Sequence, residues 1–196
     1  MARPIHYERL VIGYHGCDRA VGERVLLSGE ALTPSDNRYD WLGRGIYFWE
    51  HGPDRALEWA CEMQARGKIE EPFVLGAHVH LGRCLDLADT AATRMAEQWF
   101  GDMSAAFKKV GLPLPKNKPL KEGDHDLLLR DLDCAVLNYG LGSADQKEGH
   151  TVYQTVRGVF LEGHPAFQGS RIMTRTHVQF AVRDPTCVLG YFRPAQ

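Results

Sequence analysis

The chain contains no closely spaced cysteine pair, no long apolar run and no large excess of charge. Its five cysteines are scattered singly through 196 residues, and no two of them form a Cys-x-x-Cys pair. This odd, dispersed set predicts reduced thiols, as in a cytosolic protein. No apolar segment approaches the roughly 20 residues that a membrane-spanning helix needs, and the first residues lack the apolar core of a signal peptide. We therefore expect a cytoplasmic protein with no membrane segment.

The charge balance is close to neutral, with a formal net charge of −2 at pH 7. The chain thus lacks the broad basic surface that marks binding to nucleic acid or to anionic membranes, although a few local arginines could still hold an RNA or DNA substrate. Hydrophobic residues make up 44% of the chain and charged residues 24%, which is an ordinary globular composition. The length predicts one domain, residues 1–196, with a sizeable core.

Glycine-rich phosphate-binding loops are also missing. No glycine cluster opens a helix after a strand with the Rossmann or P-loop spacing, and strand-like and helix-like segments do not alternate regularly. These observations predict an α+β fold rich in antiparallel strands rather than a doubly wound sheet.

Apolar patterning predicts strands at 10–15, 46–49, 73–81, 84–87, 152–162, 177–183 and 187–192. Helices are expected at 18–27, from 53 onward, at 90–110 with a candidate break at Gly101, and at 127–139. Loops are expected at 33–45, 112–125 and 140–149. In the helix from 53 onward, Trp59 falls on the face that should pack on a core. The short turn at 184–186 predicts that the last two strands form a hairpin.

The stretch from Tyr39 to Trp49 carries the strongest signal for a ligand site. Gly43 and Gly45 stand beside an apolar, aromatic run, which indicates that the backbone closely approaches something there. Aromatic rings near Arg44 suit a flat, cationic ring as the ligand. Together with the strand ends near 14–16 and 177–180, this stretch predicts three short pieces that meet at one cleft.

Taken singly, the polar residues of these pieces have ordinary alternatives. A histidine at a strand end, such as His15, is often only a structural hydrogen-bonding group. Tyr47 could be simple core packing, and Gln179 could be an exposed strand residue. Gly16 would expose a backbone N–H and C=O, which is what holding a carboxamide requires. The functional hypothesis therefore depends on these residues occurring together.

Other candidates are weaker. His78 and His80 share a strand face, but no third metal ligand is evident, so we expect no metal site. Cys17 could be a nucleophile, yet no local signature supports this and a buried thiol is the simpler interpretation. Glu162 is the one carboxylate that could supplement the cleft.

The three pieces resemble the ADP-ribosyltransferase superfamily. They are Tyr14-His15-Gly16, then Leu42-Gly43-Arg44-Gly45-Ile46-Tyr47-Phe48, then Gln179-Phe180-Ala181-Val182-Arg183-Asp184. The resemblance is closest to the branch shared by diphtheria toxin and the poly(ADP-ribose) polymerases, whose signature is His, Tyr, and Glu or a substitute. The middle piece is similar to the Gly-Lys-Gly-Ile-Tyr-Phe form common in the polymerases, and the pieces occur in the family's order across nearly the whole chain.

The resemblance implies a compact α+β domain of split antiparallel β-sheets with flanking helices, and NAD bound in the cleft between the sheets. His15 would hydrogen-bond the adenine-side ribose, and Gly16 would hold the nicotinamide amide through its backbone. Tyr47 would stack on the nicotinamide ring. Gln179 stands where the family often has Glu. Further NAD contacts are expected from the loop before Tyr47, at Asn37, Arg38, Arg44 and Gly45, because guanidinium groups suit phosphate.

Gln179 restricts the chemistry that the resemblance implies. Cleavage of the N-glycosidic bond builds positive charge on the sugar, which a carboxylate would stabilise. A neutral amide can accept the ribose hydroxyl bond but cannot act as a general base. Polymer elongation is therefore disfavoured, and a single transfer is expected.

The resulting prediction is a mono-ADP-ribosyltransferase that moves ADP-ribose from NAD, used as a substrate, to a protein or nucleic-acid acceptor. Family habit suggests a bacterial toxin or defence effector with a neutralising partner. Two alternatives stay open: an NAD glycohydrolase with water as acceptor, and an inactive NAD-binding module of the same fold.

Overall fold

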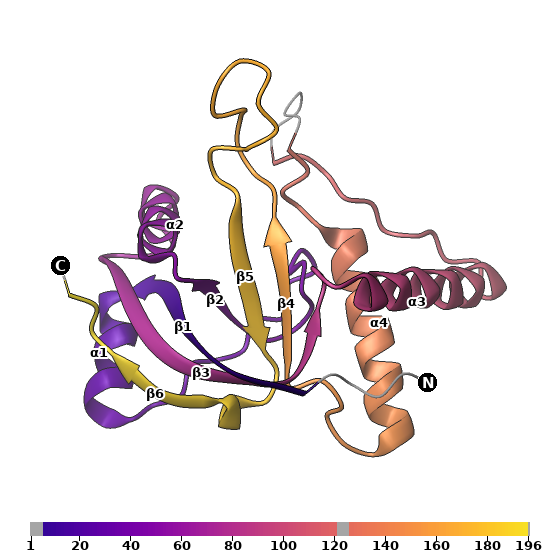
Figure 1. The fold of residues 1–196 in the computed structure, drawn as a ribbon, viewed down its shortest axis with the longest axis horizontal. Helices are drawn as coiled ribbons and strands as arrows, with labels where there is room; N and C mark the ends of the chain where they lie inside the picture. The colour runs from indigo at the N-terminus through magenta and orange to yellow at the C-terminus, as the bar shows by residue number, and fades with distance from the viewer. Residues whose placement is uncertain (1–5, 121–125, 196) are drawn as a thin grey trace.

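The computed structural model describes residues 6–120 and 126–195 (Figure 1). Within these ranges the chain forms six β-strands, four α-helices and one short 3-10 helix. The strands are β1 (His6–Asp18), β2 (Ile46–Glu50), β3 (Pro72–Asp86), β4 (Thr155–Phe160), β5 (His177–Val182) and β6 (Val188–Phe192). The helices are α1 (Arg19–Ser28), α2 (Pro53–Ala65), α3 (Thr90–Lys109), α4 (Asp131–Glu148) and the 3-10 helix η1 (Pro185–Cys187). This confirms the α+β class.

Two expectations touch residues beyond this description. The start of the chain, where no signal peptide is expected, and the last five residues of the expected connector at 112–125 lie outside the described ranges. Among the helices that are described, none combines the length and the apolar character needed to cross a membrane.

One hydrogen-bonded sheet joins the strands in the order β1-β2-β5-β4-β3-β6. Because β1 pairs with β3 as well as with β2, five strands close into a ring, and β6 lies outside it along β3. Every pair is antiparallel except β3–β4, which is parallel because residues 87–154, with α3 and α4, carry the chain across. The strands thus form one connected sheet of mixed direction, whereas two separate antiparallel sheets were expected. Membership of the ADP-ribosyltransferase fold stays a prediction.

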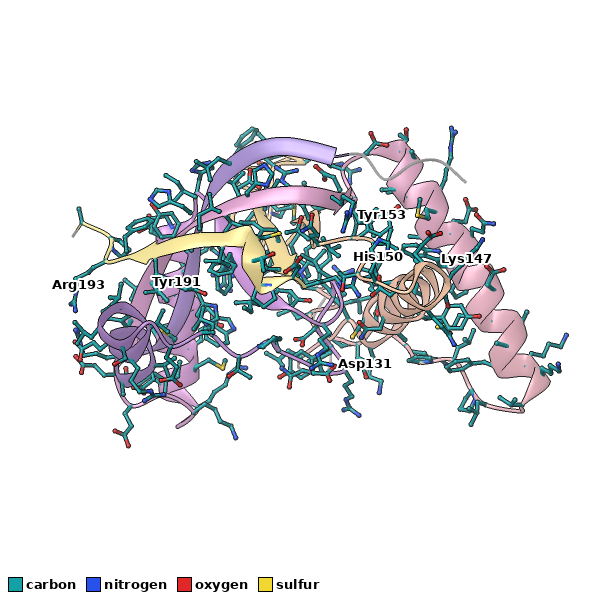
Figure 2. The ribbon with its side chains drawn as sticks, turned by 90° about the horizontal axis from the view of Figure 1, so that it is seen from below. Asp131, Lys147, His150, Tyr153, Tyr191 and Arg193 are labelled. Carbon is teal, nitrogen blue, oxygen red and sulfur yellow. The ribbon has the colours of Figure 1, made fainter. Side chains whose placement is uncertain are left out.

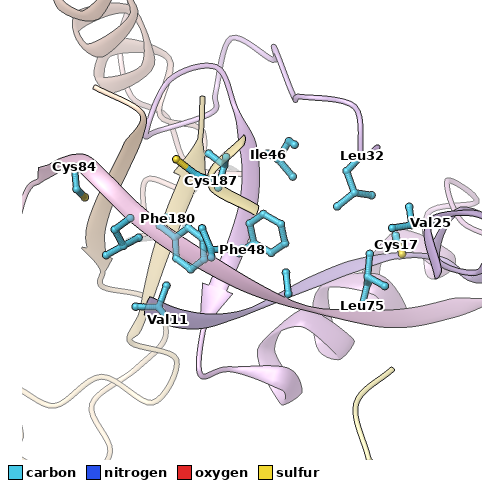
Figure 3. Close-up of a cluster of buried hydrophobic side chains, with 14 of the residues drawn as sticks. Val11, Cys17, Val25, Leu32, Ile46, Phe48, Leu75, Cys84, Phe180 and Cys187 are labelled. Carbon is cyan, nitrogen blue, oxygen red and sulfur yellow. The ribbon is translucent and has the colours of Figure 1, made fainter. Parts of the chain in front are cut away.

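Apolar side chains from the strands of this ring form one buried cluster with side chains from α1, η1 and the loop after α1 (Figure 3). The rings of Phe48 and Phe180 stack with centroids 5.3 Å apart. Gly13 of β1 lies beneath them, since a Cβ there would come within 2.5 Å of the Phe180 ring. A second buried cluster, which includes Leu137 and Leu141 of α4, packs against the other face of β4 and β5.

The first helix begins and ends where the sequence predicts. Asp18 adopts an extended conformation and its carboxylate accepts the N–H of Ala20 at 3.0 Å, which caps the start of α1. Gly29 ends the helix in the left-handed conformation, with φ +67°.

The third strand is longer than predicted, because the expected strands at 73–81 and 84–87 are parts of β3. Gly82 joins them with φ +56°. The pairing with β1 shifts register here, with Tyr7 opposite Gly82 but Leu10 opposite His80. A glycine in this conformation lets the strand bulge and continue.

The helices of the crossover also differ from expectation. α3 runs through Gly101 without a break. α4 starts at Asp131, because residues before it pair with Lys118, and it continues through most of the expected loop at 140–149. A Cβ on Gly140 would lie 1.9 Å from the Trp99 indole, so this glycine allows α3 and α4 to cross closely. Figures 1 and 2 show the two helices at the end of the molecule away from α1.

The expected hairpin between the last two strands is wrong. η1 follows β5 and turns the chain away, and its Thr186 N–H is bound by the Asp184 carboxylate at 3.1 Å. β6 then pairs with β3, with Tyr191 opposite Ala77. Gly76 makes this possible, because a Cβ there would come within 2.4 Å of the ring on the last residue of β6.

Candidate functional site

The last residues of β1 line a cavity of about 360 Å³, which we call the β1 cavity. His15 and Gly16 form one wall, α1 and the segment 30–33 form others, and Trp59 of α2 completes the lining. The structure therefore brings the first sequence motif to a concave site between the sheet, α1 and α2.

Charged groups of both signs also line the β1 cavity. Arg24 pairs with Glu30, with Nε and the carboxylate 2.9 Å apart, and Lys68 supplies a second cation. These two cations were not identified from the sequence, which directed attention to Arg38 and Arg44 instead. The lining carries as many carboxylates as cations, so an anionic group such as a diphosphate would have to displace Glu30 to reach Arg24.

Gly16 of β1 packs directly against Ala56 and Trp59 of α2. A Cβ on Gly16 would lie 2.3 Å from the carbonyl oxygen of Ala56 and 3.1 Å from the Trp59 ring. Only glycine fits there, and its backbone lies beside the Trp59 indole. Trp59 has the helical spacing of the core-facing residues of α2, so it was not identified from the sequence as a residue that lines a cavity. The signal that could have identified it is an aromatic residue on the helix that packs against Gly16.

The imidazole of His15 is held in one orientation by β2. Its Nδ1 lies 2.8 Å from the carbonyl oxygen of Tyr47, and because a carbonyl only accepts, Nδ1 carries the proton in this bond. Burial lowers the pKa of His15, and the Tyr47 carbonyl opposes this only in part. The ring is therefore neutral near pH 7 and presents Nε2 as an acceptor, which suits a sugar hydroxyl.

The phenol of Tyr47 lies on the other side of β2. The ring of Phe48 is 5.7 Å from that of His15, and successive residues of a strand point to opposite faces. The Tyr47 hydroxyl accepts the N–H of Leu42 at 2.9 Å and donates to the carbonyl of Gly43 at 2.8 Å. Burial raises the pKa of Tyr47 well above its usual value, so the phenol stays neutral. The structure thus brings His15 to the backbone of Tyr47, and the phenol to the preceding loop.

Gln179 lies on the same sheet face as Tyr47, one strand away. Trp49 is its cross-strand partner, and Tyr47 lies two residues from Trp49 along β2. The side chain is nearly buried, and its Oε1 accepts the indole N–H of Trp41 at 2.7 Å. That indole packs on β4, where a Cβ on Gly158 would come within 2.6 Å of it. Trp41 therefore fixes the orientation of the Gln179 amide.

A row of aromatic rings connects Trp41 with the β1 cavity. Ring centroids lie 5.1 Å apart for Trp41 and Phe160, and 5.5 Å apart for Phe160 and His177. The Trp49 ring continues the row, with its centroid 6.3 Å from that of His177 and 6.0 Å from that of Trp59. Burial lowers the pKa of His177 to about 4, so its ring is neutral within this row. Gln179 and the β1 cavity are thus joined by packed rings, although Gln179 does not line the cavity.

Asn37 and Gly45, predicted to contact NAD, shape the loop before β2. The Asp40 carboxylate accepts the Asn37 N–H and the Ser35 hydroxyl, both at 2.7 Å. Gly45 pairs with Ser35 through backbone hydrogen bonds. Neither Asn37 nor Gly45 lines the β1 cavity.

Arg38 and Arg44 lie on the surface of the same loop. The Arg38 Nε is 3.7 Å from the Asp131 carboxylate, and the Arg44 Nε is 3.9 Å from that of Asp36. The backbone N–H of Arg44 donates to the Asn138 side chain of α4 at 2.9 Å. The structure does not bring either guanidinium to the β1 cavity, and their contact with phosphate stays a prediction.

Glu162 is nearly buried and is bound by two arginines. Its carboxylate oxygens lie 3.0 Å from Arg55 and 2.9 Å from Arg175. With both oxygens engaged, Glu162 ties α2 to the segment between β4 and β5. Its possible role beside Gln179 stays a prediction.

The weaker candidates find other environments. No group of three or more potential metal ligands occurs within the described ranges, and the His78 ring packs 5.0 Å from that of Phe192. Burial raises the pKa of Cys17 to about 11, so its thiol is protonated and a poor nucleophile.

Comparisons of the chain with family models, with curated proteins and with solved structures gave no significant match. The candidate site therefore stands on the geometry at the end of β1. Three features define it: a neutral imidazole with a free acceptor direction, a glycine backbone without room for a side chain, and an indole beside it.

Proposed function

We propose that the protein binds NAD in the β1 cavity and transfers ADP-ribose to a macromolecular acceptor, with release of nicotinamide. The arrangement of His15, Gly16 and Trp59 around one cavity carries this proposal. Nε2 of the imidazole suits a ribose hydroxyl, the glycine backbone suits a carboxamide, and the indole suits a flat cationic ring. Lys68, and Arg24 once the diphosphate displaces Glu30, would supply positive charge for the diphosphate.

The expected chemistry is cleavage of the bond between nicotinamide and ribose. Positive charge develops on the sugar as the pyridinium leaves as neutral nicotinamide. Gln179 can accept a hydroxyl hydrogen bond but offers no negative charge, so single transfer is favoured over chain growth. Because Gln179 lies outside the β1 cavity, this role requires NAD to reach past Trp49 along the aromatic row.

The first experiment measures free nicotinamide after incubation of the protein with NAD, with and without cell lysate. Release that requires lysate supports transfer, because lysate supplies the acceptor. Release in buffer alone identifies an NAD glycohydrolase instead. A His15→Ala variant that releases nicotinamide at the wild-type rate would contradict the proposed site.

A second experiment restores the carboxylate. Gln179→Glu should raise nicotinamide release, because a carboxylate stabilises the developing charge and can still accept the Trp41 hydrogen bond. Gln98→Glu on the exposed surface of α3 is the matched control and should change nothing. No gain from Gln179→Glu, together with loss of activity in Glu162→Gln, would reassign the role to Glu162.

One observation favours a second candidate, an inactive NAD-binding module. The Tyr47 hydroxyl and the Gln179 amide oxygen are both occupied by the segment 41–43. If this segment stays in place, neither group is available for catalysis. NAD binding without nicotinamide release in either condition would support this candidate.

A further inference from the structure

A second cavity, of about 340 Å³, lies between α3, α4 and the end of β4. We call it the α4 cavity. Trp41, Phe100 and Phe160 contribute aromatic walls, and aliphatic side chains such as Leu137 and Val159 fill the spaces between them. It is separate from the β1 cavity, because the two share no lining residue.

The aromatic walls are arranged around a single arginine. The rings of Trp41 and Phe160 meet edge to face, with centroids 5.1 Å apart and an interplanar angle of 61°. The Arg130 guanidinium lies 4.8 Å over the Phe160 ring and donates to the Asp133 carboxylate at 3.2 Å. Its Nε is buried, and no partner for it exists among the described residues. Because this Nε is covered, a ligand acceptor would instead meet the terminal nitrogens of the guanidinium, whose side chain is 27% exposed.

We propose that the α4 cavity binds a purine base. A cavity of this volume is within the range of small-molecule sites, and aromatic walls with a guanidinium favour a flat ring with a π face. A purine carries ring-edge acceptors that suit Arg130. Its N–H groups suit the carboxylate of Asp133, which already accepts from Asn117 at 2.7 Å and from Arg130 but keeps a further lone pair on each oxygen. An aliphatic or phenyl group would fill the same space but would offer no acceptor to the Arg130 guanidinium.

Trp41 connects this cavity with the candidate transfer site. One indole lines the α4 cavity and donates its N–H to Gln179 at 2.7 Å. A base packed on Trp41 is therefore one side chain away from Gln179. If the proposed transferase function holds, the α4 cavity positions a base of the acceptor, and the acceptor is a nucleic acid. Purine binding itself does not depend on that function.

Calorimetric titration with GMP, AMP and a short single-stranded purine oligonucleotide tests the proposal. Val159→Trp should fill the α4 cavity, because Val159 lines it and is 45% exposed, so a larger side chain can be accommodated. We expect this variant to lose at least tenfold in purine affinity and to retain NAD affinity. Leu161→Trp, at an exposed residue outside the cavity lining, is the matched control and should bind as wild type does.

NAD itself contains adenine, so the two cavities must be separated. Ala31→Trp fills the β1 cavity from an exposed loop position and should weaken NAD but not GMP. Purine binding lost in Ala31→Trp and kept in Val159→Trp would place the base in the β1 cavity and overturn the proposal. Absence of binding by all three probes at millimolar concentration would overturn it as well. If the oligonucleotide binds more tightly than GMP, the base belongs to a nucleic acid. If the two bind equally, the ligand is a free nucleotide.

The polar edge is tested by Arg130→Met, which keeps an apolar stem over Phe160 but removes the donors. We expect at least a tenfold loss of GMP affinity, whereas Arg94→Met on the exposed surface of α3 should cause none. Indole N–H resonances in NMR spectra provide an independent readout, because base binding should shift the resonance of Trp41 even in Arg130→Met at high GMP. A shift confined to Trp59 would contradict the proposal. Nicotinamide release is scored separately, so loss of the transferase function leaves this result intact.

Discussion

The β1 cavity and the α4 cavity are similar in volume but are lined by different kinds of group. The β1 cavity is lined by strand backbone at Gly16 and by charges of both signs, whereas the α4 cavity is lined mainly by aromatic and aliphatic side chains around Arg130. The first belongs to the closed ring of strands, and the second to the crossover between β3 and β4. The comparison indicates that the ring of strands holds polar groups in fixed positions at the β1 cavity, whereas the crossover forms an apolar cavity that fits a flat ligand.

The largest expected effect separates the two cavities by function. His15→Ala removes the imidazole that presents Nε2 to the ribose, and nicotinamide release should fall about 100-fold, the scale seen when a substrate is misplaced in its site. GMP binding at the α4 cavity should not change. His78→Ala on β3 is the control, and an equal loss of release in both variants would show that the effect is structural.

The next effect concerns the α3–α4 crossing. Gly140→Ala places a Cβ against the Trp99 indole and should lower the free energy of unfolding by about 2 kcal/mol, as overpacking does. Gly142→Ala, where no atom lies within 4 Å, should instead stabilise α4 by roughly 0.5–1 kcal/mol. Urea denaturation measures both values. Equal stability of the two variants would contradict the close crossing.

A smaller effect is expected at the loop that precedes β2. Tyr47→Phe removes the hydroxyl that binds Leu42 and Gly43, and should cost about 1 kcal/mol in unfolding free energy. Hydrogen exchange at the Leu42 amide should become faster, because its acceptor is gone. Tyr39→Phe, at an exposed position of the same loop, provides the control. Unchanged exchange at Leu42 would show that the loop is held by other contacts.

The smallest effect is a pH dependence of stability at His177, in the aromatic row. Burial lowers the pKa of His177 from 6.5 to about 4. The charges of Arg55 and Arg175 also lower this pKa, and the charge of Glu58 raises it. The unfolded chain takes up a proton below about pH 6.5 and the folded chain only near pH 4, so stability falls as the pH drops through this window. The loss at pH 6 should be less than about 1 kcal/mol and should be absent in His177→Gln. Denaturation curves at pH 7.5, 6 and 5 that shift equally for both proteins would exclude this role.

Local chemistry was predictable from the sequence, whereas contacts between distant elements were not. Asp18 and Gly29 determine the ends of α1 through their own backbone and side chain, so the prediction was correct. Gly101 was interpreted as a helix break and Gly140 as the start of a loop. For Gly140 the reason is that a sequence pattern does not show the Trp99 indole that packs on it. The final hairpin was wrong for a similar reason, since Gly76 on β3 creates the space that β6 fills.

The candidate site divides in the same way. The adjacency of His15 and Gly16 follows from one strand, and the structure keeps them together at a cavity. Trp59 was missed because a ligand-facing aromatic has the same helical spacing as a core residue. The surroundings of Gln179 depend on Trp41, which is 138 residues away in the chain, and no local pattern encodes that contact.

The parallel pairing of β3 with β4 has an evolutionary consequence. Both ends of the intervening segment are anchored on neighbouring strands, so the positions that face away from the sheet can mutate or lengthen without disturbing its pairing, whereas Leu137 and Leu141 stay constrained because they pack against β4 and β5. If the α4 cavity binds a base as proposed, selection can alter this recognition while the residues at the end of β1 are inherited unchanged. In a lineage under pressure to change targets, diversification is expected to concentrate between residues 87 and 154.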